Sequence, residues 1–234
     1  MKLFQMEDTP ADIVKVYPKA SDIFKQTNIN FCCKGNIPLS EAIEKKKEAI
    51  DGDAFLKDLN SAYQTWHEEG NVEINWDEMS STELISHIVE RHHHYLKEEL
   101  EPIGFFVTKI FKVHGDKHPF LKDLYKYYHM FKVDMEAHMQ EEENDLFPLI
   151  EAYDQEKDDK LFQEIKELNT VMEQDHELAE EFLTAMHNIT DGFTPPVDAC
   201  GSFRTTYARL AELEKNTIQH VHLENNLLFK PFMH

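Results

Sequence analysis

The chain has 234 residues, of which 41% are hydrophobic, with only 7 glycines and 9 prolines, and this composition is typical of an ordinary, largely helical globular protein. The formal net charge of −21 argues against binding to nucleic acid or an anionic membrane, because like charges repel. The chain has no apolar run of the roughly 20 residues needed to span a bilayer and no signal-peptide core, and its three cysteines do not form a disulfide framework. We therefore expect a cytoplasmic protein.

Residues 1–69 are expected to form a small helical domain of their own. Thr9 and Pro10 have the residue types of a helix N-cap and first helical position. Apolar residues at helical spacing predict further short helices and a longer one over about residues 53–67. Residues 70–79 show no helical period, and we interpret them as a linker to a second domain.

Two adjacent cysteines, Cys32 and Cys33, lie in a turn-rich stretch between these predicted helices. Adjacent cysteines can close a disulfide only in a very small, strained ring, so free thiols are the expected resting state. Lys34 would favour the thiolate, which is the form that binds metal or is oxidised. The residues alone leave two interpretations open: a functional thiol pair, or two small buried side chains.

Residues 80–234 contain four long segments in which apolar residues recur every three or four positions, the spacing of a buried helix face. Short connections between long amphipathic helices predict an up-down-up-down four-helix bundle, so the fold class is all-α. Pro102 lies inside the first segment and predicts a kink or local break there. In the second segment the pattern continues past Glu142 to Leu146 and Leu149 on the buried face.

Titratable residues occupy buried positions on all four of these faces, where an unpaired charge would be costly. A histidine precedes a glutamate by four residues in the second and fourth segments, which places both side chains on one face of a helix. The metal-capable residues on the four faces are His93; His138 and Glu142; His176; and His220 and Glu224. In an antiparallel bundle these six side chains can meet at one level and bind metal. Two neighbouring histidines, His92 and His222, are expected at the surface or beside the ligands at best.

Imidazoles together with carboxylates suit iron ahead of zinc or manganese, and two glutamates can bridge two metal ions with two histidines on each. A rival, carboxylate-rich set would use the two Glu-x-x-His sequences that begin at Glu90 and Glu173. Both of these glutamates lie off the apolar faces that carry their histidines, so the helical phase favours the histidine-rich set.

These motifs resemble a known family. The sequence around His138 and Glu142, followed by Phe147-Pro148, and the run His220-Val221-His222-Leu223-Glu224 resemble the hemerythrin-like domain. The stretch Asn30-Phe31-Cys32-Cys33-Lys34-Gly35 resembles the short domain that precedes it in the iron–sulfur cluster repair (RIC) family. The oxygen-carrying hemerythrins have a further histidine one turn after His176, where this chain has Glu180, and this departure argues against a dedicated O₂ carrier.

The resemblance implies a cytoplasmic, often homodimeric di-iron protein that helps to restore iron–sulfur clusters damaged by nitrosative or oxidative stress. The six residues selected by phase match the family's ligands, which hold two non-haem iron ions bridged by carboxylates and by an oxo or hydroxo group. Expected partners are damaged iron–sulfur proteins as clients and NO or O₂ as small ligands. Iron donation, NO reduction at the iron pair, or both would perform the repair. The alternative function is a hemerythrin-like O₂ or NO sensor or carrier without repair activity.

Overall fold

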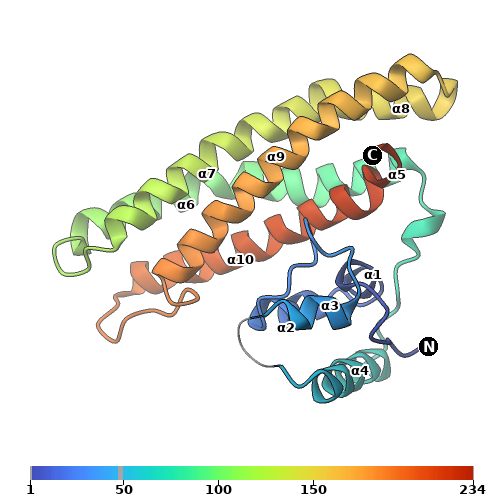
Figure 1. Ribbon diagram of the computed structural model, residues 1–234. Helices are drawn as coiled ribbons and strands as arrows, with labels where there is room; N and C mark the ends of the chain where they lie inside the picture. Colours follow the sequence, from blue (N-terminus) through green and yellow to red (C-terminus); the bar gives the residue numbers. More distant parts are fainter. Residues whose placement is uncertain (1, 47–49, 234) are drawn as a thin grey trace. The chain divides into compact units, whose positions relative to one another are not determined.

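The computed structural model describes residues 2–46 and 50–233, and over these residues the regular secondary structure is all helical (Figure 1). The chain divides into two compact units. The first comprises Met1–Ser80 together with Val221–Leu227, and the second comprises Ser81–His220 together with Leu228–His234. The first unit therefore includes seven residues of the last long helical segment of the chain.

In its described residues up to Ser80, the first unit contains four helices and one short 3₁₀ turn. Their bounds are α1 Pro10–Val16, α2 Ala20–Gln26, α3 Leu39–Glu44, α4 Gly52–Glu68 and η1 Trp76–Glu78. The predicted start of α1 is confirmed, because the Thr9 side chain accepts a hydrogen bond from the Asp12 backbone N–H and Pro10 is the first helical residue. Aromatic rings form the core of this unit: the Tyr63 ring lies 4.6 Å from that of Phe4 and 5.4 Å from that of Tyr17, measured between centroids.

Segment 70–79 packs within this same unit. Trp76 in η1 is buried, and its indole Nε1–H donates a 3.1 Å hydrogen bond to the backbone oxygen of Lys15 in α1. Lys15 also forms an ion pair with Asp77. These contacts hold the segment against α1.

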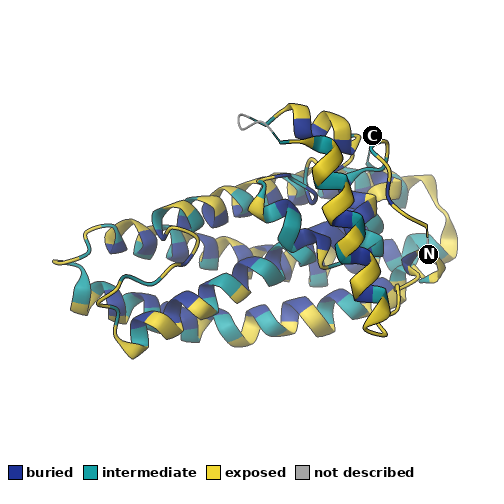
Figure 2. Ribbon diagram, turned by 90° about the horizontal axis from the view of Figure 1, so that it is seen from below, coloured by how far each residue is buried: buried dark blue, intermediate teal, exposed yellow. Residues whose placement is uncertain are grey.

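The second unit is the predicted bundle, and the all-α fold is confirmed (Figure 1). Its long segments are α5 Ser81–Ile88, η2 Val89–His93 and α6 His94–His114; α7 Leu121–Glu141, η3 Glu142–Leu146 and α8 Phe147–Glu156; α9 Asp159–Ile189; and the part of α10 Gly201–Leu223 up to His220. The π-helical turn η4 Glu224–Leu228 continues α10, and the 3₁₀ turn η5 Lys230–Phe232 follows it. Helix α7 packs against both α6 and α9, and α10 contributes Phe203, Tyr207, Leu210 and Leu213 to the shared core. Buried residues follow one face of each long helix, while exposed residues occupy the other (Figure 2).

The expected break at Pro102 is absent, because α6 continues through it from His94 to His114. The core beside this position is tightly filled: Tyr128 is fully buried, and its hydroxyl donates a 2.5 Å hydrogen bond to the backbone oxygen of Leu100. Packing of α6 against α7 thus continues past the proline, although the proline cannot donate a backbone hydrogen bond of its own.

Irregularity occurs instead at three wide π-helical turns: η2, η3 and η4. A π turn holds an additional residue, so it rotates the buried face of the helix that follows. This shift corrects the predicted pattern after Glu142: Leu146 is buried as expected, but Phe147 and Ile150 are buried where Leu149 was predicted, and Leu149 is only half-buried.

Candidate metal centre

The six candidate ligands are all withdrawn from solvent in the middle of the long segments. His93, Glu142, His176, His220 and Glu224 are 0% exposed, and His138 is 2% exposed. Every segment contributes at least one: His93 ends η2, His138 lies in α7, His176 lies in α9 and His220 lies in α10. Glu142 begins η3, and Glu224 begins η4 one turn after His220 in the same continuous helix. These six residues are called the histidine–glutamate layer. Burying such a layer costs free energy unless a cation compensates the carboxylates.

The ligand atoms gather into two sets that share both glutamates. Within each set all ligand atoms lie within 4.8 Å of one another; the sets are His93, His220, Glu142 and Glu224, and His138, His176, Glu142 and Glu224. Each set therefore has two imidazoles of its own, and the two carboxylates are common to both.

Distances within the sets fit metal coordination. The Nε2 atoms of His93 and His220 lie 3.1 Å apart, and those of His138 and His176 lie 3.0 Å apart. Two nitrogens bound at right angles to one metal ion at about 2.1 Å would be separated by about 3 Å. The two oxygens of Glu142 face different sets: Oε2 lies 3.3 Å from His93 Nε2, and Oε1 lies 3.4 Å from His138 Nε2. The donor set therefore fits a pair of metal ions with a carboxylate between them.

The π turns coincide with these residues, since three of the six candidate ligands lie within η2, η3 or η4. Turns of this type occur mostly as single insertions at functional sites, where they redirect a side chain. Sequence periodicity does not reveal them, because it treats each segment as a regular helix.

Two acidic residues that the sequence interpretation missed lie against the outer nitrogens of the histidines. Glu143 Oε1 lies 2.7 Å from His93 Nδ1, and Lys97 holds the same carboxylate with Nζ at 2.6 and 2.7 Å from its two oxygens. Burial raises the pKa of Glu143, but hydrogen bonds from Lys97 and His93 outweigh it, so the net pKa is lowered. Asp175 Oδ2 lies 3.6 Å from His138 Nδ1, too far for a hydrogen bond. A carboxylate behind a ligand histidine fixes the orientation of its ring. One sequence signal could have pointed to these two acidic residues. Each is directly adjacent to a candidate ligand, Glu143 to Glu142 and Asp175 to His176.

His92 is buried, so of the two expected positions, the surface or beside the ligands, it occupies the second. It is 6% exposed, its ring stacks on that of His220 at a centroid distance of 5.8 Å, and its Nδ1 lies 3.1 Å from Asn216 Oδ1. It therefore packs directly on a candidate ligand. The rival residues are not part of either set: Glu90 is exposed, and Glu173 accepts a 3.0 Å hydrogen bond from Asn169.

His222 is also buried, at 3% exposed, and within the first unit it contacts the loop that carries the thiols. Its Nδ1 lies 3.3 Å from the Phe31 backbone oxygen and 3.1 Å from Asn226 Nδ2. Burial lowers the pKa of His222 to about 4, although the Phe31 carbonyl opposes this shift. The imidazole is therefore neutral at neutral pH.

Asn226 holds this thiol loop, residues 30–36, by its backbone. The Nδ2 group donates to the backbone oxygens of Cys32 at 2.8 Å and Phe31 at 3.4 Å, and Oδ1 accepts a 2.9 Å hydrogen bond from Asn36 Nδ2. The neighbouring residue, Asn225, donates from Nδ2 to Cys33 Sγ at 3.7 Å. One helical turn thus carries Glu224 and the groups that bind the loop.

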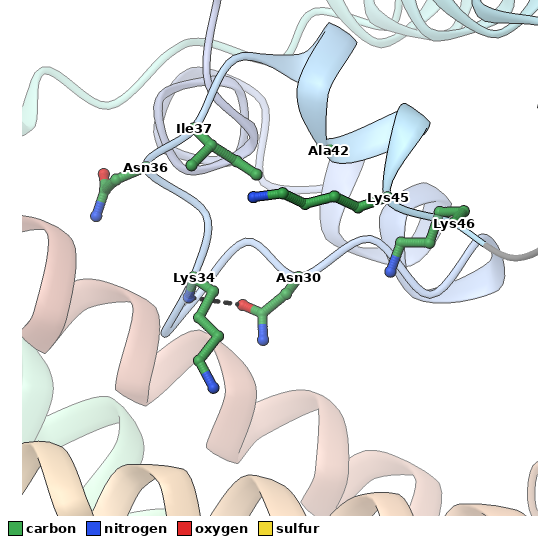
Figure 3. A pocket seen from close by; sticks show the side chains of 7 residues that line it. All are labelled: Asn30, Lys34, Asn36, Ile37, Ala42, Lys45 and Lys46. Atoms are coloured by element: carbon green, nitrogen blue, oxygen red, sulfur yellow. Dashed lines mark hydrogen bonds between the residues drawn. The ribbon is translucent and has the colours of Figure 1, made fainter.

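Cys32 and Cys33 are reduced thiols, with Cys32 buried and Cys33 half-buried. Asn30 Oδ1 accepts the backbone N–H groups of Cys33 and Lys34 at 3.1 and 3.0 Å, which makes a tight turn; Figure 3 shows the bond to Lys34. A side chain at Gly35 would place its Cβ 2.4 Å from the Phe31 backbone oxygen, so the turn requires glycine here. The two cysteines therefore lie in a hydrogen-bonded tight turn whose backbone depends on Asn30 and Gly35.

Two family models match the chain, one in each part of the sequence. The hemerythrin HHE cation-binding domain matches residues 84–231, and the ScdA N-terminal family, described as a domain of unknown function, matches residues 6–63. None of the described helices has the length and apolarity needed to cross a membrane. Together with the buried histidine–glutamate layer, these findings define a metal-binding protein of the hemerythrin HHE class.

Curated relatives cover nearly the whole chain. It is 38% identical over 224 residues to the iron–sulfur cluster repair protein ScdA of Staphylococcus epidermidis, spanning 96% of this chain and 97% of the relative. It is 36% identical over 227 residues to ScdA of Staphylococcus haemolyticus (97% and 98%) and 32% identical over 218 residues to the iron–sulfur cluster repair protein YtfE of Enterobacter sp. strain 638 (93% of each). The chain belongs to this family of iron–sulfur cluster repair proteins.

Proposed function

We propose that the protein repairs damaged iron–sulfur clusters with the help of a di-iron centre in its bundle. The observation that carries this proposal is the pair of ligand sets that share Glu142 and Glu224. His93 and His220 would hold one iron, His138 and His176 the other, and the two glutamates would bridge them. The relatives named as iron–sulfur cluster repair proteins support the activity.

Bound iron would supply redox chemistry and open positions for a small ligand such as NO or O₂. The residues of the chain have separate tasks. Glu143 accepts a hydrogen bond from the His93 Nδ1–H and so directs the opposite nitrogen towards the interior. The apolar wall around the layer, including Phe147 at 5.7 Å from the His93 ring, excludes bulk water.

The thiol pair would exchange iron or electrons with the client cluster, with Cys33 as the more accessible sulfur and Cys32 behind it. Asn225 supports this role, because an N–H directed at a sulfur stabilises the thiolate. A location in the cytoplasm, assembly as a homodimer, and damaged iron–sulfur proteins as clients belong to the same proposal.

The test compares two adjacent histidines. His93 is fully buried in one ligand set, whereas His94 is exposed and lies 3.4 Å from Glu98 on the surface. Each variant, His93→Ala and His94→Ala, is assayed for bound iron and for recovery of an iron–sulfur dehydratase inactivated by NO. We expect loss of both properties in His93→Ala and wild-type values in His94→Ala. Equal repair by both variants would overturn the proposal.

The thiol role is tested separately with the double variant Cys32→Ser, Cys33→Ser. We expect it to keep its iron and to lose most of the repair activity. Full repair by this variant would remove the thiols from the mechanism and leave the metal centre in place.

A further inference from the structure

The two ligand sets offer the same groups to the two metal positions. The His93 set adds His220, the His138 set adds His176, and Glu142 belongs to both. Within a set, the Nε2 atoms of the two histidines are 3.1 Å apart in the His93 set and 3.0 Å apart in the His138 set. Glu142 Oε2 lies 3.3 Å from His93 Nε2, and its Oε1 lies 3.4 Å from His138 Nε2. These ligand atoms give no reason for the two positions to bind metal differently.

The second histidine of each set is packed in a similar way. The ring of His92 stacks on that of His220 at a centroid distance of 5.8 Å and an angle of 9°. The ring of Phe229 stacks on that of His176 at 6.3 Å and 10°. The difference that the structure shows between the sets lies behind their first histidines, His93 and His138.

The outer nitrogen of His93 faces a carboxylate that is itself held in place. His93 Nδ1 lies 2.7 Å from Glu143 Oε1, and Lys97 Nζ lies 2.6 and 2.7 Å from the two oxygens of that carboxylate. A carboxylate in this position keeps a proton on Nδ1, leaves the Nε2 lone pair available to a metal ion and makes the ring a stronger donor. Because Lys97 restricts the Glu143 side chain, His93 is set in its ligating form.

His138 lacks an equivalent support. Its Nδ1 is buried and has no hydrogen-bond partner among the described residues, since Asp175 Oδ2 is 3.6 Å away. The Asp175 side chain is 38% exposed, compared with 27% for Glu143, and none of the described lysines and arginines forms an ion pair with it. No acceptor therefore fixes the proton of His138 on Nδ1, and only that tautomer can ligate through Nε2.

We propose that the pair Lys97–Glu143 makes the two metal positions unequal, so that the His93 set retains its ion when the His138 set has released its own. Glu143 is then a positioning residue that acts through His93. Loss of such a carboxylate lowers metal affinity by about 10–100-fold, and a difference of this size is expected between the two positions. The inference rests on the proposed di-iron function and deepens it, because it names the His138 set as the position from which iron leaves first.

Chelation of the reduced, iron-loaded chain tests this order. A ferrous-ion chelator is titrated under anaerobic conditions, and the iron that remains bound is counted. We expect two steps of one iron each, with midpoints about 10–100-fold apart in chelator concentration. In Glu143→Gln the later step should move to the earlier one, so that both irons leave together.

Three further variants sharpen this measurement. Lys97→Gln, at a side chain that is 49% exposed, removes the group that holds Glu143 and should narrow the separation between the steps without abolishing it. Asp175→Asn should leave both steps in place, because Asp175 makes no hydrogen bond to His138. Glu141→Gln is the matched control: Glu141 is an exposed glutamate two positions before Glu143, and its loss should change neither step.

The position of the retained iron is measured directly in half-depleted protein. Anomalous diffraction from its crystals should show iron in the His93 set, and iron in the His138 set, or equally in both, would overturn the inference. Mössbauer spectra add a readout that a general loss of structure would not produce. The half-depleted wild type should show one quadrupole doublet, and Glu143→Gln should shift that doublet selectively in the fully loaded protein.

Failure of this inference is distinguishable from failure of the proposed function. Simultaneous release of both irons by the wild type, or two unchanged steps in both Glu143→Gln and Lys97→Gln, would overturn the inequality of the two positions. Either result would leave intact the count of two irons per loaded chain, on which the proposed function depends. A chain that binds no iron would overturn both.

Discussion

The bundle has two kinds of interior along the same helices. Near the loops at one end, α6, α7, α9 and α10 meet through apolar side chains such as Val107, Leu124, Phe131 and Leu210, all at most 1% exposed. In the other part, the same helix faces carry imidazoles and carboxylates that are just as buried. Burial of apolar side chains stabilises the first region, whereas in the second the buried carboxylates cost free energy unless a cation compensates them. The predictions below separate these two contributions.

The largest effect is expected in the apolar region. Phe131→Ala would leave a cavity in the core, where the side chain is 1% exposed, and lower the free energy of unfolding by about 3–5 kcal/mol. Denaturant unfolding of the iron-loaded protein measures this loss. Val133→Ala, on the same helix at a site that is 63% exposed, should change stability by less than about 0.5 kcal/mol. Iron content of the folded Phe131→Ala protein should equal that of the wild type, and its loss would show that the two regions are not separable.

The second-largest effect is expected when metal is removed, because the polar region then loses the cation that compensates its carboxylates. Ligand linkage predicts a loss of about 3 kcal/mol when free metal at a hundredfold excess over its dissociation constant is withdrawn. Thermal unfolding with and without a chelator measures it. The same treatment of His138→Ala should have little effect, since that variant lacks a candidate ligand. An unchanged melting temperature of the wild type would mean that the buried layer is compensated in another way.

An intermediate effect is expected at the turn that binds the thiol loop. Asn226→Ala removes hydrogen bonds to the backbone oxygens of Phe31 and Cys32 and leaves these groups without that donor, at a cost of about 1–3 kcal/mol. Alkylation of Cys32 should become faster, and amide exchange of the loop should increase. Asn36→Ala, which loses only its 2.9 Å bond to Asn226, should show a smaller change. Equal rates of Cys32 alkylation and of loop amide exchange in both variants and in the wild type would contradict the assigned role of Asn226.

The smallest effect depends on pH and concerns the first unit. The Tyr63 hydroxyl donates to Glu73, and this hydrogen bond, opposed by burial, lowers the pKa of Glu73 below its ordinary value of 4.5. The folded state then binds fewer protons, so the contribution to stability is present above pH 4.5 and is lost as the pH falls through the lowered pKa. Since the Glu73 side chain is 40% exposed, Tyr63→Phe should reduce this contribution by only about 0.5 kcal/mol.

Unfolding of the wild type and Tyr63→Phe at pH 7 and pH 3 tests this prediction. The difference between the two proteins should shrink at the lower pH. A difference that stays constant or grows would assign the effect to packing of the Tyr63 ring.

Helical phase was enough to predict the bundle and the six buried histidines and glutamates, because a titratable residue on an apolar face is visible in the sequence. Glu143 and Asp175 could not be selected in this way, since they lie off the buried stripes and face the outer nitrogens of the rings, with only Glu143 within hydrogen-bond distance. The π turns add one residue to a helical turn, and this change of phase left Leu149 predicted where Ile150 is found. The Asn226 contacts with Phe31 and Cys32 join residues 195 and 194 positions apart, a separation that no local pattern spans.

The most direct test of the shared-carboxylate centre is the number of iron ions per chain in the purified protein and in Glu142→Ala. Both ligand sets include Glu142, so the account predicts two irons per wild-type chain and the loss of both in the variant. A wild-type protein that binds no iron, or a variant that retains both ions, would contradict it.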